Sequence, residues 1–252
     1  MAKPPPKSHE TFRASRAAEI RFARALRKVG RVSGHIVDAH VDGHEIKDAP
    51  GMKRALAEYA RLIGPWATRQ SAKMLEMVSR NNQKAYAKQS KLIGRLLRTD
   101  VAEADVGRAA LRTMNEQVEY IRSIPLDAGL RAQALALQAS IDGSRASQVA
   151  EELARSTGVS ESKADLIART EVARANASIN EARAKAVGSR QYVWRNSGDE
   201  AVRESHRVYH GRKLDGVVFS WDSPPTLDDG TTGHPGTFPN CRCYAEPFFP
   251  DE

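Results

Sequence analysis

A row of small residues at helical spacing is the feature that most constrains how this chain can fold. Six residues recur alternately four and three positions apart: Ala168, Val172, Ala175, Ile179, Ala182 and Ala186. This spacing places them along one narrow face of a helix, which we expect to run from Glu161 to Val187, with Ser160 as its N-cap and Gly188 as the residue that ends it. Because small side chains dominate this face, another segment can approach the helix backbone closely.

The chain before this helix also has a helical pattern. Apolar spacing, broken by proline and glycine, predicts helices over five ranges: Ser8–Val37, Met52–Leu97, Val106–Ser123, Leu130–Ser140 and Ser144–Thr157. Pro65 is expected to kink or restart the second of these helices, and Pro125 to stop or restart the third. Asp142 and Gly143 are expected to join the last two.

The pattern changes after Gly188, where short strands replace long helices. Three segments are predicted strands: Gln191–Trp194, Val217–Trp221 and Asn240–Glu246. A short helix that contains His206 is expected to begin at Asp199 and to end near Gly211. Trp194 and Trp221 flank the small sheet and are expected to fill its core.

These elements predict a mainly α fold with a small α+β domain at the C-terminus, long helices before it and short β-strands within it. We divide the chain into a basic helical arm (1–100), a helical connecting region (101–159) and the α+β domain (160–252). Residues 1–100 hold 21 Lys and Arg against 9 Asp and Glu, whereas the remainder holds 18 against 22. The basic arm suggests a polyanionic partner, with double-stranded DNA as the candidate and a solvated helix face as the alternative.

The spacing of cysteine and histidine suits a metal site. Cys241 and Cys243 lie two positions apart, so on a strand both side chains point to one face. His206 and His210 lie four apart and share a face of the predicted helix, and His234 lies in the loop before the cysteines. Zinc prefers such ligands in a tetrahedral array. We expect a structural Zn²⁺ at His206, Cys241 and Cys243 with His210 or His234 as fourth ligand; the alternative is a core histidine beside two buried thiols.

Four groups of residues in the C-terminal part occur together in one order. They are Ile167-Ala168-Arg169-Thr170-Glu171 with Asn176, then Trp194 with Asp199 and His206, then Pro224-Pro225, and then Pro239-Asn240-Cys241-Arg242-Cys243. This ordered set resembles the phage Mu F-like family of head morphogenesis, or minor head, proteins. Ser123-Ile124-Pro125 and the expected turn Thr157-Gly158-Val159-Ser160 also look like that family, so the resemblance covers roughly residues 105–247.

The resemblance implies a minor capsid protein of a tailed bacteriophage, bound near the portal inside the head. It implies a structural role in head assembly and in DNA packaging or delivery. The implied partners are the portal protein and the inner capsid or scaffold surface. The chain would be made in the cytoplasm of the bacterial host and would end in the head interior. Members of the family place a cysteine pair where this chain has Arg203 and His206, and arginine cannot bind a metal.

The resemblance also marks a set of residues as a structural motif: Arg169, Thr170, Glu171, Asn176, Trp194, Asp199, Asn240 and Arg242. Arg169 and Asn176 are expected to tie their helix to the loop before Cys241 by hydrogen bonds, or by an ion pair with Asp199. The alternative is that these polar residues form a solvated helix face.

Catalytic signatures are not found in the sequence. The spacing of His206 and His210 is that of a metalloprotease helix, but Arg207 occupies the position of the Glu general base. The sequence contains no P-loop, dinucleotide fingerprint or Gly-x-Ser-x-Gly elbow. No apolar run approaches the roughly 18 residues that a membrane span needs. We therefore expect a binding protein without catalytic residues; the alternatives are a zinc-dependent nuclease and a DNA-binding protein.

Overall fold

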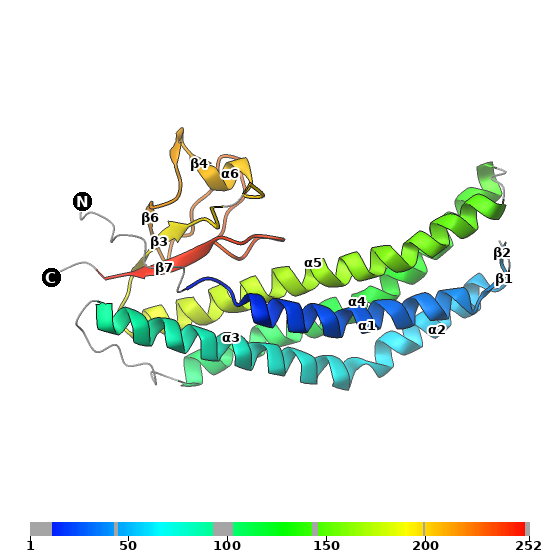
Figure 1. The fold of residues 1–252 in the computed structure, drawn as a ribbon, viewed down its shortest axis with the longest axis horizontal. Coiled ribbons are helices and arrows are strands. Elements are labelled where there is room, and N and C mark those ends of the chain that lie inside the picture. Colours follow the sequence, from blue (N-terminus) through cyan, green and yellow to red (C-terminus); the bar gives the residue numbers. More distant parts are fainter. Residues whose placement is uncertain (1–11, 43–44, 93–102, 143–145, 199, 250–252) are drawn as a thin grey trace. The chain divides into compact units, whose positions relative to one another are not determined.

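The computed structural model describes residues 12–42, 45–92, 103–142, 146–198 and 200–249 (Figure 1). In this part of the chain the helices are α1 (Arg16–Asp38), α2 (Ala49–Leu62), α3 (Gly64–Leu92), α4 (Glu103–Asp142), α5 (Ala146–Ala186) and α6 (Glu204–Arg207). The strands are β1 (Val41–Asp42), β2 (Glu45–Ile46), β3 (Gln191–Arg195), β4 (Val208–Tyr209), β5 (Arg212–Lys213), β6 (Val218–Ser220) and β7 (Tyr244–Phe248). Long helices followed by short antiparallel strands confirm the predicted fold class.

Helix α5 begins earlier than the sequence predicts. It starts at Ala146, so Ser160 is not an N-cap and the expected turn at 157–160 is helical. A glycine inside a helix costs only about 1 kcal/mol relative to alanine, so Gly158 alone does not end a long helix. The predicted helices over 130–140 and 144–157 are therefore parts of α4 and α5, while their junction at 143–145 lies outside the described residues.

The two prolines have different effects on the helices. Pro125 lies inside α4 and does not end it, so the predicted break is wrong. Proline removes one backbone hydrogen bond, but Ile121, Ile124 and Ala128 around it are fully buried, and their packing holds the helix together. Pro65 follows the first residue of α3, where the missing N–H group has no helical partner in any case, which confirms the predicted restart.

The chain forms two compact units, and each combines segments of all three sequence regions. The helical unit comprises Glu19–Lys73 and Met114–Ala168. The mixed unit comprises the described residues of Met1–Ala18, Met74–Thr113 and Arg169–Glu252. The division at residues 100 and 159 stays a prediction about the domains.

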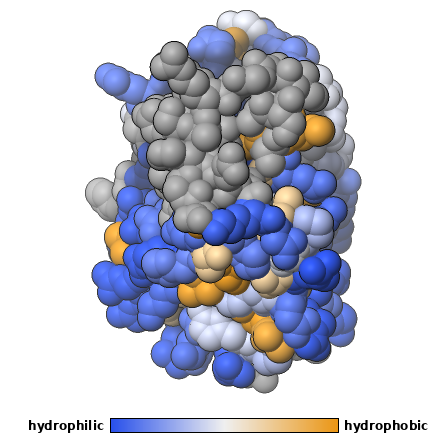
Figure 2. Space-filling view, turned by 90° about the vertical axis from the view of Figure 1, so that its right-hand side faces the viewer, coloured by the Kyte–Doolittle hydropathy of each residue, from blue (hydrophilic) through white to orange (hydrophobic). Residues whose placement is uncertain are grey.

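Helix contacts hold the helical unit together. Its buried cluster consists of Val37, Met52, Leu56 and Ala132. Gly129 of α4 lies so close that a Cβ atom there would be 3.1 Å from Leu56 Cδ1. At the surface, the Arg27 guanidinium donates two hydrogen bonds to Asp165, at 2.7 and 2.9 Å. Figure 2 shows one face of the molecule, on which hydrophilic residues predominate and hydrophobic residues form small separate patches.

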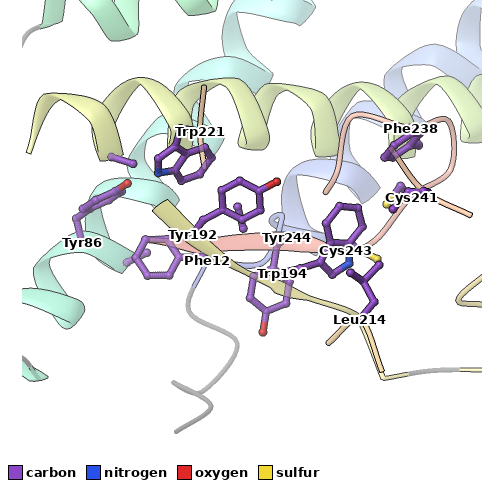
Figure 3. Close-up of a cluster of buried hydrophobic side chains, with 14 residues drawn as sticks. Phe12, Tyr86, Tyr192, Trp194, Leu214, Trp221, Phe238, Cys241, Cys243 and Tyr244 are labelled. Carbon is purple, nitrogen blue, oxygen red and sulfur yellow. The ribbon is translucent and has the colours of Figure 1, made fainter. Parts of the chain in front are cut away.

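A three-stranded antiparallel sheet in the order β6-β3-β7 forms the centre of the mixed unit. Tyr192 in β3 pairs with Phe219 in β6 and with Pro247 in β7, which confirms the first two predicted strands. The main core of this unit is aromatic, as Figure 3 shows. Trp194 and Trp221 are both buried in it, as predicted. Phe12, which precedes α1, packs edge to face on Tyr86 of α3 with ring centroids 5.1 Å apart.

The small-residue face of α5 is buried over most of its length. Four of the six predicted residues are buried: Ala168, Val172, Ala175 and Ile179. Ala182 and Ala186 are only partly buried, whereas Arg183 and Ala184 are buried instead. A straight helix drifts by about 20° per heptad relative to a strict alternation of three and four. The buried face therefore moves from position 182 to positions 183 and 184.

A buried polar network joins α3 to α5. Asn180 of α5 accepts hydrogen bonds from Asn82 and Tyr86 of α3 through its side-chain oxygen, and its amide donates to the Ala245 carbonyl oxygen at 2.8 Å. Arg183 donates to the Asn82 side-chain oxygen at 2.7 Å. Burial raises the pKa of the Tyr86 hydroxyl well above its usual value, so this group stays a donor. The side-chain amide of Asn180 thus connects its own helix, α5, to helix α3 and to strand β7.

A buried ion pair lies on the sheet itself. Arg195 Nε of β3 is 2.6 Å from Glu246 Oε2 of β7, and the two side chains are 6% and 1% exposed. At this depth an unpaired charge costs several kcal/mol, whereas the pair is close to neutral relative to a well-packed apolar pair. The stability of the protein therefore requires that Arg195 and Glu246 are either both present or both replaced.

Asn180→Ala should destabilise the protein by about 2–4 kcal/mol, because it leaves buried hydrogen-bonding groups of α3 and β7 without their partner. Chemical denaturation followed by circular dichroism measures this free energy of unfolding. Gln83→Ala, a change at an exposed position of α3, is the matched control and should have little effect. Equal stability of Asn180→Ala and the control would show that the network does not hold α5.

Glu246→Ala or Arg195→Ala alone should destabilise the protein by about 3–5 kcal/mol, since each leaves one buried charge unpaired. The double variant Arg195→Ala with Glu246→Ala should lose much less stability than the sum of the two single changes. A double-mutant cycle on the free energy of unfolding measures this coupling. The exposed pair Arg61 and Glu58 provides the comparison and should show far weaker coupling. Additive effects at 195 and 246 would contradict a buried pair.

Candidate metal centre

The residues after α5 form a C-terminal module, which we define as the described residues of 189–249. His206 lies in α6, a single helical turn inside this module. The Arg203 guanidinium before it donates to the carbonyl oxygen of Pro239, and Arg207 Nε donates to the carbonyl oxygen of Val202 at 2.9 Å. These bonds fix the turn, and His206 points inward with only 2% of its surface exposed.

The two cysteines lie in a loop and not on a strand. Strand β7 begins at Tyr244, so the predicted strand from Asn240 starts four residues too early. Asn240 has a left-handed backbone with a φ of 58°, which interrupts the extended chain. Helix α5 holds this loop, because the Asn240 N–H group donates to Thr170 Oγ1 at 3.0 Å and Arg169 donates to Asn240 Oδ1 at 2.7 Å.

The structure brings together the three residues that the sequence predicted as the main metal ligands. The Sγ atoms of Cys241 and Cys243 each lie 3.5 Å from Nδ1 of His206. The three potential ligand atoms all lie within 4.8 Å of one another. The ring of Phe238 is 4.9 Å from that of His206, and the ring of Trp194 is 5.6 Å away, so aromatic groups surround the cluster (Figure 3).

The two thiols influence each other strongly. The hydrogen bond with Cys243 lowers the pKa of Cys241, and His206 lowers it further, which outweighs the effect of burial. The hydrogen bond with Cys241, together with burial, raises the pKa of Cys243. The pair therefore titrates as one unit, with a proton held between two sulfur atoms. Within the described part of the chain, His206 Nε2 is buried without a hydrogen-bond partner.

The structure does not bring His210 or His234 into this cluster. The chain leaves α6 after Arg207 and enters the β4–β5 hairpin, so His206 and His210 do not share a helix face. His210 is exposed, with a φ of 49°, and its backbone N–H group donates to Asp228 at 3.0 Å. The helical spacing argument for His210 was therefore wrong.

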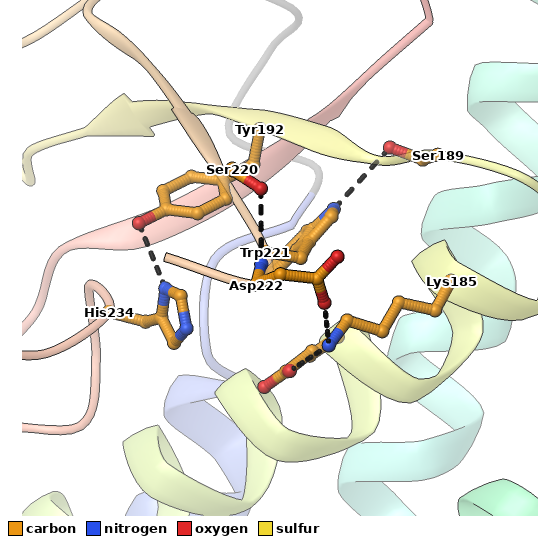
Figure 4. A network of polar contacts seen from close by, with 8 residues as sticks. Lys185, Ser189, Tyr192, Ser220, Trp221, Asp222 and His234 are labelled. Atoms are coloured by element: carbon orange, nitrogen blue, oxygen red, sulfur yellow. Dashed lines mark hydrogen bonds and ion pairs between the residues drawn. The ribbon is translucent and has the colours of Figure 1, made fainter. Parts of the chain in front are cut away.

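His234 belongs to another polar network, which Figure 4 shows. Its Nδ1 atom is 2.9 Å from the Tyr192 hydroxyl. Burial lowers the pKa of His234 and raises that of Tyr192, so the hydrogen bond joins a neutral ring and a neutral hydroxyl. Nearby, Lys185 pairs with Glu181 and Asp222, both at 2.9 Å. This network connects α5 to the loop after β6.

The motif residues bind other parts of the protein and do not form a solvated face. Arg169 ties α5 to the cysteine loop, as predicted, and Thr170 does so as well. Asn176 was expected at the same loop, but its amide donates to the carbonyl oxygen of Phe12 at 2.9 Å. Glu171 is buried, and Arg174 lies 3.3 Å from it. Trp194 is in the core, Arg242 is exposed, and Asp199 lies outside the described residues.

Sequence reasoning missed two residues that position the loop. Arg174 Nε donates to the carbonyl oxygen of Thr237 at 3.0 Å. Gly236 has a φ of 91°, and a Cβ atom there would lie 3.4 Å from both the Ala173 carbonyl oxygen and Ala177 Cβ. The small-residue spacing of α5 was the signal for such a close approach, but it did not indicate which segment makes it.

Comparison with known proteins agrees with this geometry. Residues 132–246 match the profile of the family described as Phage Mu protein F like protein. An uncharacterized protein of Haemophilus influenzae is 35% identical over 130 residues, which are 52% of this chain and 26% of that protein, so the match spans about a quarter of the relative's length. No solved structure shows a significant match. None of the described helices is both long and apolar enough to cross a membrane. Residues 132–246 of this chain are thus similar to the phage Mu F-like family.

Proposed function

We propose that this protein is a minor head protein of a tailed bacteriophage and that it acts by binding during head assembly. The family match over residues 132–246 supports the role in head morphogenesis. The structural observation that supports this role is that the motif residues Arg169 and Thr170 hold the cysteine loop of the module against α5. Arg169 and Thr170 therefore hold the surface of the module in place, and they do not line an open binding site.

Burial of the cluster supports binding over catalysis. Cys241 and Cys243 are 4% and 6% exposed, and His206 lies among aromatic rings. The scissile bond of a nucleic acid must come within hydrogen-bonding distance of a catalytic group. A duplex cannot reach side chains at this depth, which counts against the zinc-dependent nuclease.

The proposed location is the head interior near the portal, with the portal protein and the inner capsid or scaffold surface as partners. The proposal includes synthesis in the host cytoplasm before assembly. Two parts of the chain suit different contacts. The module offers a fixed surface, whereas the long helices carry most of the basic charge of residues 1–100.

Helix α1 supports a DNA contact as part of this role. Four exposed basic residues recur three and four positions apart along it: Arg21, Arg24, Lys28 and Arg31. This spacing places them on one side of the helix, where they can follow a phosphate backbone without reading its sequence. Arg31 also lies 3.7 Å from Glu161, while Arg61 and Arg80 of the other helices are each paired with a glutamate of their own helix.

Mass spectrometry of purified proheads and virions should detect the protein, because a minor head protein is assembled with the shell. Arg169→Ala removes the hydrogen bond to Asn240, and we expect several-fold less incorporation since the module surface loses its support. Arg212→Ala, at an exposed position of β5, is the matched control and should be incorporated normally. The wild-type chain missing from both proheads and virions would refute the proposal.

Binding to duplex DNA of random sequence should weaken steeply as salt rises. Replacing Arg24 and Lys28 by Gln should reduce the slope of log affinity against log salt by about 2, because two phosphate contacts are lost. The matched variant with Arg61→Gln and Arg80→Gln has the same change in charge and should keep the slope. Fluorescence anisotropy at several salt concentrations makes the measurement, and equal slopes for both variants would exclude a contact through α1.

A further inference from the structure

The donor atoms of the cluster have the separations that a tetrahedral zinc ion imposes. Zinc binds sulfur at about 2.3 Å and imidazole nitrogen at about 2.0 Å, so ligands at the tetrahedral angle place nitrogen and sulfur about 3.6 Å apart. Both sulfur atoms lie 3.5 Å from the same Nδ1 atom of His206. Both nitrogen–sulfur distances therefore suit one ion bound to all three atoms, which lie within 4.8 Å of one another.

Hydrogen bonds alone do not account for this arrangement. One imidazole nitrogen carries either one proton or one lone pair in the ring plane, so it can form one well-directed bond and not two. Yet two sulfur atoms lie at the same distance from Nδ1. A cation at the centre would satisfy all three groups with directed bonds.

We propose that Cys241, Cys243 and His206 bind one Zn²⁺ ion through their two sulfur atoms and Nδ1. Two thiolates and a neutral imidazole balance the charge of the ion, and sulfur with nitrogen ligands selects zinc over magnesium or calcium. The described part of the chain supplies three ligands, because His210 and His234 bind elsewhere.

The ion joins two segments that are far apart in the sequence. His206 comes from the α6 turn, while the cysteines come from the loop that α5 holds through Asn240. Coordination fixes these segments more firmly than packing does, because binding energy of the metal becomes folding energy of the site. The ion is structural, since the same burial that excludes nucleic acid also surrounds it.

The test uses the full chain purified without a histidine tag. Elemental analysis and native mass spectrometry should find one zinc per chain, and a chelator should lower Tm until ZnCl₂ restores it. Cys241→Ser, Cys243→Ser and His206→Ala should each weaken zinc affinity by more than about 100-fold, since each loses a direct ligand. His210→Ala and His234→Ala are the matched controls and should keep one zinc.

A second measurement covers the case in which ligand variants fail to fold. The wild-type chain loaded with Co²⁺ in place of zinc should show the sulfur-to-cobalt absorption of two thiolate ligands in a tetrahedral site, and both cysteines should resist alkylation until the metal is removed. A wild-type chain that takes up less than one zinc even with added ZnCl₂ would overturn the proposal. So would loss of the metal in His210→Ala or His234→Ala.

Discussion

The position of the module depends on the contact between its loop and the backbone of α5. A Cβ atom at Gly236 would lie 3.4 Å from both the Ala173 carbonyl oxygen and Ala177 Cβ, so the loop lies directly against the helix. Three polar groups of the helix then fix the loop, since Thr170, Arg169 and Arg174 bind its backbone and its asparagine. These hydrogen bonds depend on the close approach, because they can form only where the loop lies against the helix.

This contact also orders the candidate metal site. The loop that carries the cysteines is held by α5 on one side and meets His206 on the other. Trp194 and Phe238 pack against the ring of His206, so its orientation is set by the core. The three donor atoms are therefore placed by packing and hydrogen bonds before any ion binds. Such preorganisation reduces the loss of conformational entropy that would otherwise accompany metal binding.

The sequence predicted the elements better than their ends. Long-range periodicity identified the helices, the sheet strands and the buried tryptophans, because burial imposes a repeat on the sequence. The ends failed where packing outweighs a local preference: Pro125 and Gly158 both lie inside helices. The site was found from residue types, since His206 and both cysteines do meet. The geometric reasons were partly wrong, because the left-handed Asn240 and the hairpin after Arg207 depend on distant contacts that no local pattern encodes.

Arg203 connects two segments of the module at a position where the resemblance to the Mu F-like family implies a cysteine. Relatives are expected to have a cysteine there, which could bind an ion shared with the cysteine loop. Arg203 instead donates a hydrogen bond to the Pro239 carbonyl oxygen, two residues before Cys241. The bond joins the same two segments, the α6 turn and the cysteine loop. A hydrogen bond thus connects the two segments in place of a metal ligand. Because the segments are still held together, His206, Cys241 and Cys243 remain close to one another.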